Sequence, residues 1–236
     1  MKRQLTILLM MLALPTLVGA QVRLSVDVQS VQVAEGKKIT TERSICLHPD
    51  GRMIVEQHRP SHNITLTNTL GEMRIYTPTT NDVAVINNKD LASSKDIIAI
   101  FASGSYVDMA LPMYGYTQSS IRNEGGMIIK TYTPESVSAT AMVELVFQNH
   151  LPICMVYYNA KGEAMRKLYF SKYQYERIPI PMRITEVEYT VKRDSLVRLS
   201  NYSNLLFDGE AQSPLFDFQI PAGAKHTTID PSQLFQ

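Results

Sequence analysis

The sequence contains no tryptophan, only two cysteines and no surplus of charge of either sign. Its 23 basic and 22 acidic residues argue against a protein that binds nucleic acid through phosphates, because such a protein needs a basic surplus. With 11 Gly and 12 Pro among 236 residues, 44% of them hydrophobic, the chain is neither fibrous nor disordered. No repeat, linker or low-complexity tract divides it, so we expect a single domain over residues 21–236.

Residues 1–20 have the features of a secretory signal peptide. Lys2 and Arg3 precede a short apolar run, and the small residues Gly19 and Ala20 follow it. A membrane anchor is the alternative, but this run has about 14 residues where a bilayer needs roughly 20. No later segment is long and apolar enough to span a membrane. We therefore expect cleavage after Ala20 and an exported, soluble mature protein.

The two cysteines, Cys46 and Cys154, leave two interpretations open. Export permits a disulfide, which would close a loop of about 108 residues and stabilise the fold by roughly 4–5 kcal/mol in the chain-entropy model. Both residues, however, lie in apolar, strand-like runs, where a free cysteine serves as a small core residue. This position favours free thiols.

Alternation of apolar and polar residues dominates the mature chain. Leu24, Val26 and Val28 alternate with polar residues, and a change of phase near residues 29–30 predicts a bulge or bend there. Turn sequences such as His-Pro-Asp-Gly at 48–51 separate the alternating runs. The last apolar stripe lies at 216–220. We expect about ten strands in one large, mainly antiparallel sheet.

One segment has helical rather than strand-like spacing. Ser93 and Asp96 form a capping box at its start, with Asp96 expected to face solvent, and Gly104 is placed to end a helix of about ten residues. Three apolar side chains share one helical face and are expected to point inward: Ile97, Ile98 and Phe101. Such a helix either covers an opening of the sheet as a lid or simply fills the sheet.

The usual catalytic and metal-binding motifs are absent from the sequence. It contains no His-Glu-x-x-His, no closely spaced cysteine pair, no Gly-x-Ser-x-Gly and no Gly-x-Gly-x-x-Gly. Glu186 and Glu188 lie two residues apart in an alternating run, and we interpret them as the solvent side of a strand. We expect no enzyme activity, no cofactor and no metal. The 12 Met and 12 Tyr suit an apolar surface for varied ligands, although core filling explains them equally.

Four short motifs, in a fixed order after the signal peptide, carry a resemblance to a known family. They are the Gly-led stretch 51–60 that ends in Arg59-Pro60, the turn 87–91, the stretch 181–185 followed by 202–204, and Phe-x-Phe-x-x-Pro-x-Gly at 216–223. In these motifs the sequence resembles the periplasmic outer-membrane lipoprotein carriers and lipoprotein-sorting proteins (LolA-like). It differs from them in having no tryptophan, strand-like residues at 22–33 where the family has a helix, and only one evident lid helix.

The resemblance implies a strongly curved, incomplete antiparallel β-barrel with helices over its open mouth. It also implies a periplasmic carrier that holds acyl chains of a lipid or an acylated lipoprotein in an apolar cavity for transfer to the outer membrane. Membrane donor and acceptor proteins would be further partners, and we expect a monomer that binds no nucleic acid. Arg59 matches the arginine that holds the family's lid closed through hydrogen bonds to lid backbone. A ligand site would thus comprise Arg59, Ile97, Ile98 and Phe101.

Two other functions stay open on the sequence alone. One is a sensor or adaptor of the same fold in the cell envelope, which binds a lipid-like or protein signal without shuttling it. The other is a structural assembly factor whose cavity is closed by its own side chains.

Overall fold

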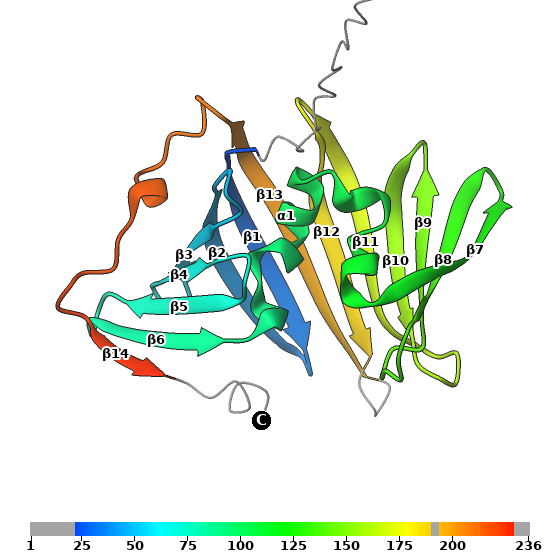
Figure 1. Ribbon diagram of the computed structural model, residues 1–236, viewed down its shortest axis with the longest axis horizontal. Coiled ribbons are helices and arrows are strands. Elements are labelled where there is room, and N and C mark those ends of the chain that lie inside the picture. Colours follow the sequence, from blue (N-terminus) through cyan, green and yellow to red (C-terminus); the bar gives the residue numbers. More distant parts are fainter. Residues whose placement is uncertain (1–21, 190–193, 229–236) are drawn as a thin grey trace, which may run out of the picture.

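The structure, a computed structural model, describes residues 22–189 and 194–228. Its strands form a single curved sheet, and one short α-helix with several 3-10 turns accounts for the helical structure of the described part (Figure 1). The strands are β1 (Leu24–Ala34), β2 (Lys37–Leu47), β3 (Met53–Arg59), β4 (Asn63–Thr67), β5 (Glu72–Thr77), β6 (Asp82–Asn87), β7 (Tyr116–Glu124), β8 (Met127–Pro134), β9 (Met142–Gln148), β10 (Leu151–Tyr158), β11 (Ala164–Tyr175), β12 (Pro179–Tyr189), β13 (Ser195–Phe207) and β14 (Lys225–Thr228). The α-helix is α1 (Ile97–Ala102).

Consecutive strands pair as antiparallel hairpins from β1 to β6 and from β7 to β13, and residues 88–115 connect these two series. Their order across the sheet is β14-β6-β5-β4-β3-β2-β1-β13-β12-β11-β10-β9-β8-β7. β1 pairs with both β2 and β13 and so joins two series of hairpins. Neighbours are antiparallel apart from β14 and β6, which run parallel. Among the described residues no strand lies beyond β14 or β7. The expectation of a mainly β, curved and unclosed sheet is therefore confirmed.

The expected number of about ten strands was too low, since the described residues alone form a sheet of 14. β7 (Tyr-Thr-Gln-Ser-Ser-Ile-Arg-Asn-Glu) and β14 (Lys-His-Thr-Thr) are mostly exposed edge strands without an apolar stripe, so hydrophobic periodicity does not reveal them. Conversely, the stripe at 216–220 is not a strand. It begins in the 3-10 turn η5 (Pro214–Asp217) and packs on the outer face of the sheet, where Phe216 joins Ile54 and Cys46 in a small second core.

The main core lies on the inner, concave face of the sheet. Alternate residues of the central strands point to this face, as Leu24, Val26 and Val28 do from β1 and Leu168 and Phe170 do from β11. A covering segment, residues 88–115 between β6 and β7, lies across the inner face and carries α1 together with four 3-10 turns (Figure 1). Burial of apolar area between this segment and the sheet stabilises the fold by roughly 25 cal/mol per Å².

β1 runs without the expected break at residues 29–30. Its pairing with β2 is continuous from Leu24 to Ala34, and the one register shift against β13 lies between Ser25 and Asp27. The change of phase in the sequence instead marks the point where apolar residues move from the inner to the outer face of β1. Beyond Val28, polar residues face inward and apolar residues face outward, with Val33 43% exposed.

α1 is shorter than expected and begins at a different residue. Asp96, not Ser93, is the N-cap, because the Asp96 carboxylate accepts the Ile98 N–H at 2.8 Å. The Ser93 hydroxyl is buried and donates to the Gly51 carbonyl at 2.5 Å, which ties the covering segment to the turn between β2 and β3. Gly104 follows the helix in the left-handed conformation (φ 77°), as expected of a residue that ends it.

Other sequence expectations concern the thiols and the N-terminus. Cys46 and Cys154 are free, and burial raises the pKa of both thiols. The signal peptide over residues 1–20 lies outside the described residues. Within 22–189 and 194–228, no helix combines the length and apolar character that crossing a bilayer requires.

Candidate functional site on the inner face of the sheet

α1 is held on the inner face by two of the three residues expected to point inward. Phe101 is fully buried; its ring stacks on Tyr106 at 5.6 Å and meets the edge of Phe170 at 5.6 Å. Ile98 is 1% exposed, whereas Ile97 is only partly buried at the margin of the core. The expected helical face therefore exists, and its side chains fill the concavity of the sheet.

A small cavity lies on the side of α1 that sequence reasoning did not consider. Its volume is about 170 Å³, and its lining is mainly apolar. Ala99, Ala102 and Ser103 border it from the helix, and Val22 and Leu47 border it from the sheet. Positions 102 and 103 follow position 99 by three and four residues and so share its side of the helix; small residues with this spacing were a signal for the cavity that the sequence contained.

This cavity is small for a lipid site. Ligand pockets commonly measure about 300–1,000 Å³. An engineered cavity of about 150 Å³ in another protein binds benzene. About 170 Å³ therefore accepts the end of a hydrocarbon chain, and a longer chain requires α1 to move.

His48 is one of the residues that line the cavity. It belongs to the turn between β2 and β3, and its ring meets the edge of Phe216 at 5.1 Å. Its Nε2 is buried and has no hydrogen-bond partner in the described part of the chain. Burial, followed by the nearby charge of Arg52, lowers the pKa of His48, so the ring is neutral at pH 7.

Arg59 does not make the contacts that the resemblance implies. Its side chain is 72% exposed, and its Nε lies 3.5 Å from the Glu42 carboxylate rather than against the backbone of α1. The arginine beside the helix is Arg43, which points to the inner face from β2. Its charge acts on Asp96 and Tyr202, and its Nε is buried without a hydrogen-bond partner among the described residues. Burial raises the pKa of Asp96 although Arg43 opposes this effect.

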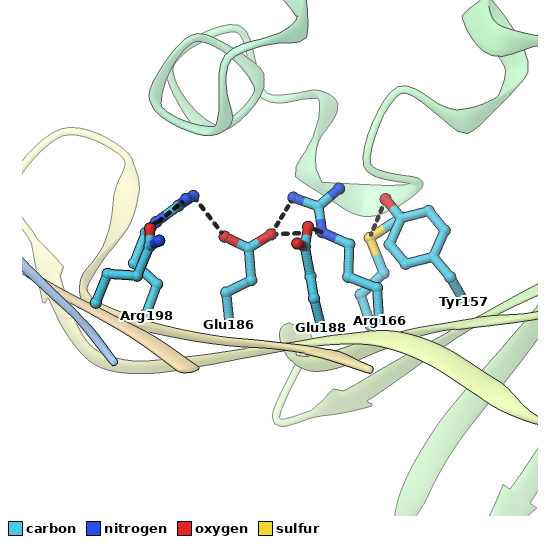
Figure 2. Close-up of polar contacts among 7 residues, drawn as sticks. Tyr157, Arg166, Glu186, Glu188 and Arg198 are labelled. Carbon is cyan, nitrogen blue, oxygen red and sulfur yellow. Dashed lines mark hydrogen bonds and ion pairs between the residues drawn. The ribbon is translucent and has the colours of Figure 1, made fainter. Parts of the chain in front are cut away.

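The inner face has a second, polar end, which we define by Arg166, Glu186 and Arg198 together with Gln32 and Ser30. Glu186 Oε1 accepts from Arg166 at 2.5 Å, and Oε2 accepts from Arg198 at 3.0 Å (Figure 2). Arg198 also donates to Gln32 Oε1 from Nη2 at 2.8 Å, and the Ser30 and Ser200 hydroxyls are 2.8 Å apart. The remainder of the inner face, where β1 and β11 pack against α1, is the apolar end.

The interpretation of Glu186 as a solvent-facing residue was wrong. Its side chain is 9% exposed and points to the inner face, on the same side of β12 as Ile180 and Ile184. The apolar partners in its alternating run, Val187 among them, face outward. Alternation alone does not tell which face is covered, and here the covered face receives the carboxylate because two guanidinium groups compensate its charge.

Comparison with solved structures finds the same architecture in proteins of low sequence identity. A LolA superfamily protein from Nitrosomonas europaea is 13% identical with a TM-score of 0.56, over 84% of this chain and 90% of that one. A DUF1329 family protein from Desulfovibrio piger is 17% identical with a TM-score of 0.56, over 85% and 90%. An outer membrane lipoprotein-sorting protein domain from Vibrio parahaemolyticus is 13% identical with a TM-score of 0.56, over 83% and 89%.

The chain has the same fold as the LolA superfamily protein and the lipoprotein-sorting domain. No family model and no curated protein sequence matches the chain. The expected LolA-like resemblance is confirmed for the fold. An identity of 13–17% supports the shared fold alone, so no residue's role is carried over from these proteins to this chain. No group of three or more His, Cys, Asp or Glu that could hold a metal ion occurs in residues 22–189 and 194–228.

Proposed function

We propose that this LolA-fold protein is a periplasmic carrier that binds an acyl chain of a lipid or acylated lipoprotein against its inner face. Three features support the proposal. The inner face is apolar over most of its area, the sheet is open at both edges, and the covering segment contains a single six-residue α-helix. Each buried CH₂ of an acyl chain contributes about 0.8 kcal/mol, which favours such a shelter over water.

The cavity beside α1 carries the proposal. A chain end that enters this cavity would displace no side chain, since Ala99 and Ala102 leave the space empty. Further insertion pushes α1 away from the sheet and puts chain methylenes where Ile98 and Phe101 now lie. A short helix opens more readily than a long one because fewer contacts break together. In this scheme Arg43, rather than Arg59, holds the start of the helix through its charge on Asp96.

Blocking the cavity tests the proposal. Ala102→Leu fills the space, so we expect it to abolish binding of a fluorescent fatty acid while wild type binds it. Ile97→Leu, a volume-conserving change on the opposite side of α1, is the control and should bind normally. Native mass spectrometry of gently purified wild type should show bound lipid as a discrete added mass. Absence of added mass together with absence of fatty-acid binding would refute the carrier function.

A second candidate function has one observation in its favour. The complete burial of Phe101 among Tyr106, Phe170 and Tyr173 is typical of a helix that permanently fills the sheet, as in a structural assembly factor. Phe101→Glu separates the two. The variant should lose several kcal/mol of stability in either case, because Phe101 is fully buried. A protein that opens should bind lipid as wild type and lose that binding in the variant, because the charge lies where acyl carbon belongs. A permanently filled protein should bind no lipid in either form.

A transfer assay separates a carrier from a non-shuttling sensor of the same fold. A labelled lipoprotein is loaded in donor vesicles and its appearance in acceptor vesicles is followed with and without the protein. Transfer that rises with protein concentration indicates a carrier. Binding without transfer indicates a sensor or adaptor.

A further inference from the structure

The polar end of the inner face places a carboxylate where an apolar residue would suffice. Burying Glu186 costs several kcal/mol in desolvation, which Arg166 and Arg198 must offset. Leu168 lies directly opposite Glu186 on β11, so the cluster borders the apolar core. A purely structural cluster needs only enough donors to satisfy Glu186, and the two arginines supply more than that.

The two guanidinium groups are fixed and yet accessible. Arg166 donates to Glu186 from Nε and Nη2, and Arg198 is oriented by both Glu186 and Gln32. The third guanidinium nitrogen of Arg166 points away from Glu186 and makes no contact with the residues drawn in Figure 2. The two arginine side chains remain 41% and 42% exposed, whereas Glu186 is 9% exposed. Donors held in place before a ligand arrives lose little freedom when they bind it.

The surroundings of Arg166 suit a molecule that is polar at one end and apolar at the other. The Tyr157 ring lies 5.5 Å from the Arg166 guanidinium carbon and packs against the main core. Two residues along β11 therefore separate the charged side chain of Arg166 from Leu168 in the main core. An amphiphile can place a negative group beside the arginines while its chain runs toward α1.

We propose that Arg166 and Arg198 bind an anionic headgroup, a phosphate or a carboxylate, of the amphiphile that this protein carries. This inference rests on the proposed carrier function and specifies its ligand. Guanidinium groups bind both anions through charge-assisted, often bidentate hydrogen bonds. Glu186 orients the arginines and limits their affinity, and Glu188, 3.7 Å from Arg166 and half exposed, competes with the headgroup.

The test compares two amphiphiles with the same chain and different headgroups, dodecyl phosphate and dodecyl maltoside, below their micelle concentrations. The measured quantity is the ratio of the two dissociation constants in wild type and variants. We expect Arg166→Gln and Arg198→Gln to shift this ratio about tenfold against the phosphate. Glu188→Gln should shift it several-fold in favour of the phosphate. Arg183→Gln is the matched control, because Arg183 lies on the outer face of β12 and contacts Asn201.

The outcomes are distinguishable. A ratio that both arginine variants leave unchanged, with dodecyl maltoside still bound, overturns the headgroup site and leaves the carrier function standing. Failure of wild type to bind either amphiphile overturns the carrier function and the inference with it. Inorganic phosphate is measured as a separate arm. If it binds as tightly as dodecyl phosphate, the arginines bind free phosphate and the assignment to a lipid headgroup is overturned.

Discussion

The two ends of the inner face are built from the same strands and differ in what they cover. At the apolar end, β1 presents Leu24, Val26 and Val28 to α1, and the side chains there are almost completely buried. At the polar end, β1 presents Ser30 and Gln32, and the arginines beside them are about 40% exposed. The pairing of β1 with β2 runs through both ends without a break. The difference teaches that the sheet provides the frame, while the side chains decide which part is closed and which part meets solvent.

Removing the largest buried side chain of the apolar end should have the largest effect. Phe101→Ala leaves a cavity next to Phe170 and Tyr106, so we expect the free energy of unfolding to fall by about 3–5 kcal/mol. Urea unfolding measures it. Ile97→Ala, at the half-buried margin of the same helix, should cost clearly less. A loss below about 1 kcal/mol for Phe101→Ala would mean that α1 is only loosely held on the sheet.

At the polar end, the effect should depend on burial rather than on charge alone. Glu186→Gln keeps the shape but weakens three charge-assisted contacts, so we expect a loss of about 1–3 kcal/mol. Glu188→Gln, half exposed on the same strand, should change stability by about 0.5 kcal/mol or less. Denaturant titration of both variants decides the matter. Equal losses at the two positions would contradict the burial argument.

Sequence alone predicts the strands of this fold better than it predicts which face of each strand is covered. Alternation revealed most strands because one face of each packs on a core and the other does not, and the turn at 48–51 is confirmed between β2 and β3. The inward position of Glu186 depends on Arg166 and Arg198, which come from two other strands. The small residues of α1 are a local signal for one wall of the cavity, but the opposite wall includes Leu47 of β2, which no local pattern relates to α1. Arg59 was expected against the lid, but the pairing of β2 with β3 places it opposite Glu42, a neighbour that local sequence does not reveal.

The cap of α1 offers a test of how the covering segment is held at the apolar end. Asp96→Ala removes the acceptor of the Ile98 N–H, so we expect a loss of about 1 kcal/mol. Asp96→Asn retains an equally good cap and should cost less. Thermal unfolding compares the two. Similar losses for Asn and Ala would show that the charge facing Arg43, and not the cap, is what matters.

The difference in stability between wild type and Asp96→Asn should also depend on pH. The pKa of Asp96 is raised in the folded protein, so the folded state holds this proton more tightly than the unfolded state. Stability contributed by this group is therefore present below the ordinary Asp pKa of about 4 and is lost as the pH rises through the folded value. Asp96→Asn lacks an ionisable group at this position. The difference in unfolding free energy between wild type and Asp96→Asn should thus shift against wild type with rising pH.

The smallest expected effect concerns His48 at the cavity. Its pKa is lowered by burial, so the unfolded chain binds this proton more readily than the folded protein, and stability falls as the pH drops through about 6.5. His48→Gln should flatten that part of the stability profile. A fatty-acid chain in the cavity adds apolar surroundings to the His48 ring, which disfavours the charged ring further. NMR titration should therefore show a lower pKa of His48 with a bound fatty acid than without it, the other histidines serving as internal controls. An unchanged His48 titration in the complex would place the chain elsewhere on the inner face.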